Sequence, residues 1–492
     1  MSLKEAVELK FNFKNSKISA TLQAGRKKFI NQEQIIVEAS MKKKLYLIVI
    51  TVAIIILILS AGFLLTQQTP PKETGTPQAF VGIAYCGNTV AEGKQLIDKV
   101  KSYTNLFALQ SGTLYRDLPS VEELGDYAIA AGMYFLPSFG EFIQEPLSEW
   151  LDAMKLKWGD HLLGVYHADE PGGKMLDDYV KFSDPNTGDS ITKTKYGDIV
   201  VQKPNNIVIT YHLNGDIRLS EPAPANSNSD INSEKVFHAD GTADVIKAAP
   251  NGFSYQTYQQ LQELRVFKDV DETVQRFYAR DKDKMDFLRD KTQVFTSDYA
   301  LYWFDYLAGY NVMLGQIGWN LSTTQQISLL RGAATAQQKD WGVIITWKYQ
   351  QPPFLDTGTE ILSQLKTSYE CGAKYLIVFN YYTENSGPYG TMKEEHFEAV
   401  KTFWKDVVKN PDIIQGSIKA DTLVIFPKNY GWGTRWAEDK IWGIFKADQQ
   451  TQQLWTLMQT TLEKHGLNTD IIYEDTNYPP PSTYQNIYHY QK

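Results

Sequence analysis

The sequence predicts an α/β fold: a (β/α)8 barrel with a long insertion after its fourth strand and a small β-α-β unit at its C-terminus. Three observations predict it. Short apolar runs of strand length alternate with amphipathic stretches of helical length from residue 80 onward. Eight such strand–helix units fit between residues 80 and 410. The fourth apolar run ends abruptly in Asp169-Glu170-Pro171, and acids at the tip of a buried strand are costly unless they are paired or used.

The barrel elements follow one another at regular intervals. The predicted strands are Val81–Cys86, Leu106–Gln110, Tyr134–Phe139, Leu162–Ala168, Val294–Ser297, Val312–Gln316, Trp341–Thr346 and Tyr375–Asn380. The predicted helices are Val90–Tyr103, Val121–Ala131, Leu147–Trp158, Thr323–Gln338, Glu360–Cys371 and Lys393–Lys409. Because the strands of such a barrel are parallel, their carboxyl ends meet at one mouth, where barrel enzymes place their active sites.

The interval between the fourth and fifth strands, residues 174–291, is far longer than one helix requires. A hairpin is predicted around Asn214-Gly215, with Ile207–Leu213 against Ile217–Ser220, and a helical stretch over Asp271–Phe287. Since the insertion leaves the fourth strand at the mouth, we expect it to form a lid or side wall of the site.

The C-terminal segment, residues 411–492, predicts a strand over Thr422–Phe426, a helix over Gln449–Lys464 and a second strand over Thr469–Tyr473. No G-x-G-x-x-G motif follows the first strand, so dinucleotide binding is not expected and no cofactor is predicted. The loop 429–442 is rich in aromatic and charged residues. It either borders the site or packs between the two units, and packing is favoured because Trp and Arg are enriched at interfaces.

The N-terminal part predicts a single-pass membrane anchor. Residues 45–65 carry no charged side chain over about 21 positions, enough to cross a bilayer. Lys42, Lys43 and Lys44 precede this run, so the positive-inside rule places residues 1–44 in the cytoplasm and the large domain outside the cell membrane. Residues 66–79 read as a linker. Two alternatives stay open: residues 1–40 are an over-extended start before Met41, or the anchor is a signal cleaved near Leu59-Ser-Ala-Gly62.

Composition excludes several classes of function. The net charge is −8 and no basic stripe interleaved with aromatic residues occurs, so nucleic acid is not an expected partner. Cys86 and Cys371 fall at opposite ends of the predicted barrel and are not expected to pair. The 7 His are scattered, and no cluster has the spacing of metal ligands.

Strand alternation selects one of the two acids at the fourth strand. Leu163 and Val165 suit the face that helices cover. The residues then expected inside the barrel are Gly164, Tyr166, Ala168 and Glu170. Glu170 is therefore the first candidate for a catalytic carboxylate. The alternative is that it is an ordinary loop acid that binds backbone amides.

Polar and aromatic residues gather at the other strand ends. Asp298 and Glu384 are further candidates for a catalytic carboxylate. The candidate substrate-binding residues are Tyr85, Gln110, Glu141, Asp169, Tyr299, Gln316, Trp347, Asn380 and Tyr382. Each alone has an ordinary explanation as a strand-end cap. Carboxylates, amides and aromatic faces together are what a carbohydrate site requires.

At this point the chain resembles the glycoside hydrolase barrels of the large retaining clan, which includes β-galactosidase-like and cellulase-like enzymes. In them the acid/base Glu closes the fourth strand, usually within Asn-Glu-Pro, which Asp169-Glu170-Pro171 matches with Asp in place of Asn. Arg331-Gly-Ala-Ala334 and Trp341–Trp347 look like their sixth helix and seventh strand. The C-terminal unit looks like a cut-down form of the α/β domain that follows the barrel in some of them. The resemblance implies that Glu170 is the acid/base and that Asp169 contacts the sugar 2-hydroxyl.

One departure from that pattern is large, because the seventh strand ends without the nucleophilic Glu of the clan. A double displacement needs a second carboxylate about 5–5.5 Å from the first, and inversion needs a wider gap. Asp298 or Glu384 would have to supply it. The sequence therefore predicts a membrane-anchored extracellular glycoside hydrolase acting on O-glycosidic bonds. Two alternatives remain: an inactive barrel that binds glycan or a cell-surface partner, and a hydrolase or lyase acting on something other than a sugar.

Overall fold

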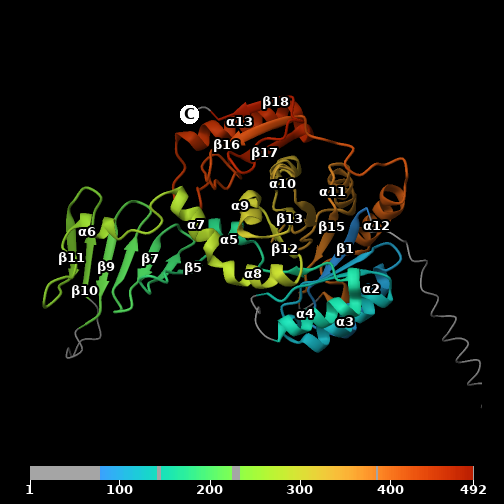
Figure 1. The fold of residues 1–492 in the computed structure, drawn as a ribbon, viewed down its shortest axis with the longest axis horizontal. Helices are drawn as coiled ribbons and strands as arrows, with labels where there is room; N and C mark the ends of the chain where they lie inside the picture. The colour runs from blue at the N-terminus through green and yellow to red at the C-terminus, as the bar shows by residue number, and fades with distance from the viewer. Residues whose placement is uncertain (1–77, 141–145, 224–232, 384–385, 491–492) are drawn as a thin grey trace, which may run out of the picture. The chain divides into compact units, whose positions relative to one another are not determined.

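The computed structural model describes residues 78–140, 146–223, 233–383 and 386–490 (Figure 1). The predicted tail and apolar span, nearly all of the linker, and the candidates Glu141 and Glu384 lie outside these ranges. In the described part of the chain, no helix is long and apolar enough to cross a membrane.

Eight parallel strands form the central sheet of the molecule, as predicted. They are β1 (Phe80–Tyr85), β2 (Leu106–Leu109), β3 (Tyr134–Pro137), β4 (Val165–Tyr166), β12 (Val294–Asp298), β13 (Val312–Ile317), β14 (Asp340–Ile345) and β15 (Tyr375–Asn380). Their order is β3-β2-β1-β15-β14-β13-β12-β4. Parallel bridges from Phe135 to Leu162 and from Ser138 to Tyr166 join the two outer strands and close the barrel. The chain therefore folds as a (β/α)8 barrel.

Strand alternation divides the barrel residues into two cores. The inner core is a compact cluster that includes Phe80, Tyr166, Phe295 and Tyr375. Phe80 stacks on Tyr375 with ring centroids 5.1 Å apart. The outer core lies between the strands and the surrounding helices, which are α2 (Val90–Val100), α3 (Leu118–Ala130), α4 (Leu147–Trp158), α8 (Lys282–Lys291), α9 (Tyr302–Ala308), α10 (Thr323–Gln337), α11 (Gly358–Glu370) and α12 (Glu394–Phe403).

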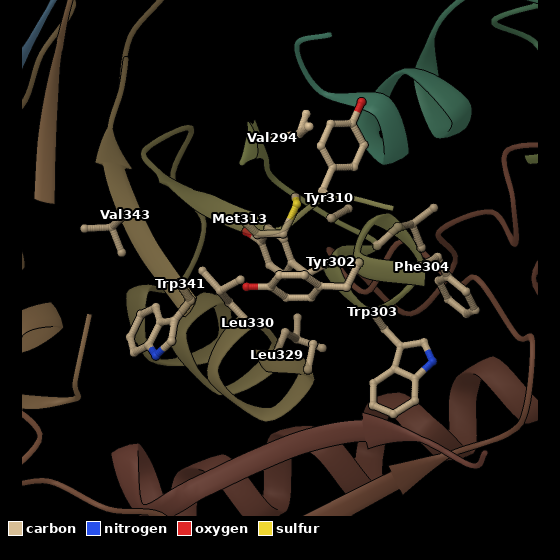
Figure 2. Packing of buried hydrophobic residues seen from close by; sticks show 14 of the residues in the cluster. Val294, Tyr302, Trp303, Phe304, Tyr310, Met313, Leu329, Leu330, Trp341 and Val343 are labelled. Carbon is tan, nitrogen blue, oxygen red and sulfur yellow. The ribbon is translucent and has the colours of Figure 1, made fainter. Parts of the chain in front are cut away.

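The sequence pattern did not predict helix α9, which lies between β12 and β13. Residues Tyr302–Tyr306 are all buried, so the segment has no polar face and lacks the helical alternation of apolar and polar residues. Figure 2 shows Tyr302 beside Leu329 and Leu330 of α10, whereas Phe304 points away from them; Phe304 packs on Trp442 and Tyr473 instead. Burial on all sides explains why the sequence pattern missed this helix.

The insertion after β4 is a larger structure than the single predicted hairpin. A short helix, α5 (Pro171–Asp177), leads into a seven-stranded antiparallel meander. Its strands are β5 (Val180–Ser183), β6 (Ser190–Lys193), β7 (Ile199–Gln202), β8 (Val208–Tyr211), β9 (Ile217–Glu221), β10 (Ser233–Phe237) and β11 (Ala243–Lys247). The predicted hairpin is β8–β9, with Tyr211 opposite Ile217. The predicted helical stretch is α7 (Val270–Arg280) followed by α8, and α6 (Tyr258–Glu263) precedes it.

The C-terminal unit contains the predicted β-α-β and one further strand. Strand β16 (Thr422–Phe426) lies between β17 (Thr469–Tyr473) and β18 (Asn486–His489), all parallel, with α13 (Gln449–His465) connecting β16 to β17. The unit packs on α10, where the guanidinium of Arg331 pairs with Asp470 at 2.8 Å. The aromatic loop 429–442 packs against the rest of the chain, as the packing interpretation predicts, because Trp442 contacts Phe277 and Phe304 with ring centroids 5.3 Å and 4.7 Å away.

Candidate active site

A cavity of about 520 Å³ opens at the carboxyl ends of the barrel strands, and every one of the eight strands or the loop that follows it contributes to its lining. The lining residues are Cys86, Asn88, Gln110, Gly112, Ser138, Tyr166, Asp169, Glu170, Ser297, Gln316, Trp319, Ile344, Thr346, Trp347, Phe379, Tyr381 and Tyr382. Asp169, Glu170, Gln110, Gln316, Trp347 and Tyr382 are thus brought together as the sequence predicted.

The chain makes a strained turn where β4 delivers Glu170 to the cavity. Ala168 and Glu170 both have positive φ, 46° and 54°, although neither is Gly. Such conformations persist only where the surroundings hold them, and they cluster at functional sites. The backbone N–H of Glu170 donates to the Ser297 carbonyl at 3.0 Å, and Pro171 then starts α5. The turn therefore fixes the Glu170 backbone against the neighbouring strand β12.

Among the described residues, Gln316 is the one direct hydrogen-bond partner of the Glu170 carboxylate in the cavity. Gln316 donates from Nε2 to Glu170 Oε1 at 2.6 Å, and Trp319 donates from Nε1 to Gln316 Oε1 at 3.3 Å. Burial is the main cause that raises the pKa of Glu170, and the adjacent Asp169 charge raises it further. The hydrogen bond from Gln316 and the charge of Lys174 act in the opposite direction. A carboxyl group with a raised pKa keeps its proton to a higher pH than an exposed Glu, which favours general acid catalysis.

Asp169 is held beside Glu170 by hydroxyl groups. It accepts hydrogen bonds from the Tyr166 hydroxyl and, at 3.1 Å, from Ser297 Oγ. Ser297 Oγ in turn lies 3.2 Å from Gln316 Nε2, the group that binds Glu170. One network of Tyr166, Ser297 and Gln316 therefore orients both acids. Among the described lining residues, these two are the acidic side chains.

Aromatic side chains form one wall of the cavity around Trp347. Its ring centroid lies 5.9 Å from that of Trp319 and 4.8 Å from that of Tyr381, in a tilted and an edge-on arrangement. Phe379 lies 6.5 Å away. Flat aromatic faces beside carboxylates and amides match the mixed apolar and hydroxyl faces of a sugar ring.

Several candidate residues lie outside the cavity. Tyr85 is buried, and its hydroxyl donates to the Thr89 carbonyl at 2.6 Å. Asn380 is buried and accepts from the Met392 N–H at 3.2 Å. Tyr299 donates to Asp177 Oδ2 at 2.8 Å. None of the three is among the residues that line the cavity.

Asp298, a candidate for the second catalytic carboxylate, is also absent from the cavity lining. Its side chain is fully buried and accepts hydrogen bonds from backbone N–H groups in the first turn of α5 and in the loop after β12. Burial, and then the charge of Glu170, raise the pKa of Asp298, whereas the hydrogen bonds from the backbone N–H groups of Gly173, Tyr299 and Ala300 lower it. The structure thus places this carboxylate behind the cavity wall. Glu384, the other candidate, lies outside the described residues.

Three lining residues that the sequence interpretation missed, Cys86, Ser297 and Tyr381, follow the alternation rule. Phe295 belongs to the inner core, so Ser297 points inward and Asp298 outward. The same shift by one residue separates Tyr85 from Cys86 and Asn380 from Tyr381. The alternation of apolar residues along each strand was therefore the signal that could have identified them.

Comparisons with known proteins find only remote structural matches. No protein-family model and no curated protein sequence matches the chain. A structure of the pneumococcal virulence factor StrH, described with N-glycan recognition and hydrolysis, matches at 9% identity and a TM-score of 0.32, over 69% of this chain and 86% of that one. Gas2p of Saccharomyces cerevisiae in complex with laminaritetraose and laminaripentaose matches at 12% identity and a TM-score of 0.30. That match covers 70% of this chain and 67% of Gas2p. A broad-specificity GH5-4 endoglucanase from an uncultured bovine rumen ciliate matches at 8% identity and a TM-score of 0.30. That match covers 64% of this chain and 86% of the endoglucanase. At these values the function has to be argued from the site itself.

Proposed function

We propose that the chain is a glycoside hydrolase that cleaves O-glycosidic bonds, with Glu170 as general acid and base. The observation that carries the proposal is Glu170 itself: a carboxyl group with a raised pKa, held by Gln316, facing a cavity with an aromatic wall. Cleavage of a glycosidic bond requires a proton on the departing oxygen, and a positioned acid of this kind supplies it.

Asp169 has a different role in this proposal. The hydroxyl groups of Tyr166 and Ser297 hold its carboxylate in place in the cavity. In the proposed role it accepts a hydrogen bond from the sugar 2-hydroxyl, and its negative charge stabilises positive charge that develops on the sugar ring in the transition state. Asp169 and Glu170 thus act on the same sugar from one strand tip.

The localisation is part of the proposal. The apolar run at residues 45–65, with Lys42, Lys43 and Lys44 before it, supports a single membrane-spanning anchor with the barrel on the extracellular side. The glycan would then be a surface or environmental one.

A second candidate function is a barrel that binds glycan without cleaving it. It is favoured by one observation: within the described lining residues, no carboxylate other than Asp169 accompanies Glu170. Both retaining and inverting hydrolysis normally use a second carboxylate across the sugar. This candidate keeps the aromatic wall and the network of Gln316 and Ser297 as recognition groups.

Two variants separate these functions when they are assayed on a panel of aryl glycosides and oligosaccharides. Glu170→Gln keeps the shape of the side chain and removes the acid, so we expect hydrolysis to fall by about 100- to 10,000-fold with binding retained. Asp169→Asn is expected to lower kcat while keeping the residual activity dependent on Glu170. Measurable glycan affinity of the unmodified protein without turnover of any substrate would favour the binding function.

A further inference from the structure

Asp298 connects two segments behind the cavity, the start of helix α5 and the loop after β12. Its oxygens accept hydrogen bonds from Gly172 N at 2.7 Å and Gly173 N at 2.9 Å, in the first turn of α5 directly after Glu170. They also accept from Tyr299 N at 2.7 Å and Ala300 N at 3.2 Å, in the loop after β12. Four backbone N–H groups directed at one carboxyl group favour its ionised form.

The approach of these loops is too close for ordinary side chains. A Cβ on Gly172 would lie 2.7 Å from Leu301 Cβ, and one on Gly173 would lie 2.4 Å from the Tyr299 ring. The two glycines therefore let the chain pack directly against Asp298. The strained residues Ala168 and Glu170 come immediately before them, so the same contact holds the strain in place.

A second buried carboxyl group, Asp305 of α9, faces Asp298. None of the described N–H or O–H donors reaches either of its oxygens. An ionised carboxylate without a donor would be very costly in such a buried place, whereas a neutral one can itself donate to Asp298. Burial, and next the charge of Asp298, raise the pKa of Asp305 well above its ordinary range, which agrees with this assignment.

We infer that Asp298 and Asp305 form a buried pair that shares one proton, with Asp298 as the anion, and that Asp298 is a positioning residue for Glu170. The inference rests on the function proposed above. Asp305 supplies the proton of the pair and touches neither the cavity nor the turn of Glu170.

The charged and titratable groups around the pair fit this assignment. Glu170 raises the pKa of Asp298, and by reciprocity the Asp298 anion favours the protonated form of Glu170. Arg280 of α7 lowers the pKa of Asp305, but it is already paired with Asp281 at 2.7 Å. The Tyr302 phenol lies near both acids, and burial with their charges raises its pKa, so it stays neutral.

Two isosteric variants of the same buried pair test the inference. Asp298→Asn removes the anion and is expected to lower kcat about 100-fold, the cost of a misplaced catalytic group, with KM within about 3-fold. The alkaline limb of its pH–rate profile should move to lower pH, because Glu170 loses a negative neighbour. Asp305→Asn can still donate an N–H to Asp298 and should keep both kcat and the pH limb. The inference would be overturned if kcat fell equally in both variants. It would also be overturned if the alkaline limb of the pH–rate profile stayed in place in Asp298→Asn.

A spectroscopic measurement keeps the inference testable if Asp298→Asn fails to fold or if no glycoside is hydrolysed. The infrared band of protonated carboxyl groups at pH 7 should lose a component in Asp305→Asn relative to the unmodified protein. Loss of no component in that variant would show that Asp305 is ionised and contradict the pair. Failure of the proposed function leaves this result unaffected, so the two failures are distinguishable.

Discussion

At the scale of single residues, two adjacent acids, Asp169 and Glu170, form hydrogen bonds with different partners. Glu170 binds an amide of Gln316, whereas Asp169 binds the hydroxyl groups of Tyr166 and Ser297. The two acids lie close enough for the charge of Asp169 to raise the pKa of Glu170. Proton donation and charge stabilisation can therefore be divided between them, as happens where two carboxyl groups have contrasting surroundings.

Asp305 also gives a prediction about stability. Its pKa is raised in the folded protein, whereas the unfolded chain ionises it with a pKa of about 3.9. The stabilisation associated with its proton is therefore fully present below about pH 4 and is lost as the pH rises toward the folded pKa. Because Asn carries no such proton, Asp305→Asn should gain thermal stability relative to the unmodified protein between pH 4 and pH 8. Melting curves at pH 4, 6 and 8 measure this difference, and a difference that stays constant would show that Asp305 is ionised in the folded chain.

At the scale of elements, the sequence predicted most of the barrel because its strands and helices follow simple periodicities. Helix α4 begins and ends as predicted, at Leu147 and Trp158. Helix α9 was not predicted because it is buried on all sides and therefore lacks a polar face.

The site was predicted only in part, because its prediction depended on how strand alternation was applied at each strand end. At β4, alternation was extended past the end of the strand to choose Glu170 over Asp169, but both acids line the cavity, because the chain turns after Tyr166. At β12, the more polar Asp298 was preferred to its inward neighbour Ser297.

The aromatic wall gives a prediction about substrate affinity. Trp347 packs against Trp319 and Tyr381 and faces the cavity. Trp347→Ala should weaken glycan binding and raise KM about 10-fold, because a sugar face loses its stacking surface. Trp404→Ala, a Trp outside the cavity lining, is the matched control and should leave KM unchanged. Equal KM values for the two variants would show that the aromatic wall around Trp347 does not contact the substrate.

The contact between α10 and β17 gives a prediction about packing. A Cβ on Gly332 would lie 2.4 Å from the Ile471 carbonyl oxygen, whereas one on Gly112 would meet nothing within 4 Å. Gly332→Ala should therefore destabilise the fold by about 1–3 kcal/mol through overpacking. Gly112→Ala serves as the control. Urea unfolding midpoints measure both, and an unchanged midpoint in Gly332→Ala would mean that the helix is free to move away from the C-terminal unit.

At the scale of the whole molecule, none of the described residues of the insertion lines the cavity, so the expected lid or side wall is not seen there. The insertion and the C-terminal unit instead contact each other and the segments behind the site. The insertion begins with α5, and Asp177 at the end of that helix pairs with Arg435 of the C-terminal loop, NH2 to Oδ1, at 3.0 Å. Trp442 of the same loop packs on Phe304 of α9, the helix that carries Asp305. The sequence indicated that both parts exist, but not these contacts, because pairings between distant segments leave no local periodicity.

The central claim is that Glu170 is the proton donor for glycoside cleavage. The most direct test compares Glu170→Gln with the unmodified protein on a single activated aryl glycoside and on the matching unactivated oligosaccharide. An activated leaving group departs without a proton, so the variant is expected to lose far more activity on the oligosaccharide, by about 100-fold or more. Equal activity of the variant and the unmodified protein on both substrates would show that Glu170 is not the proton donor.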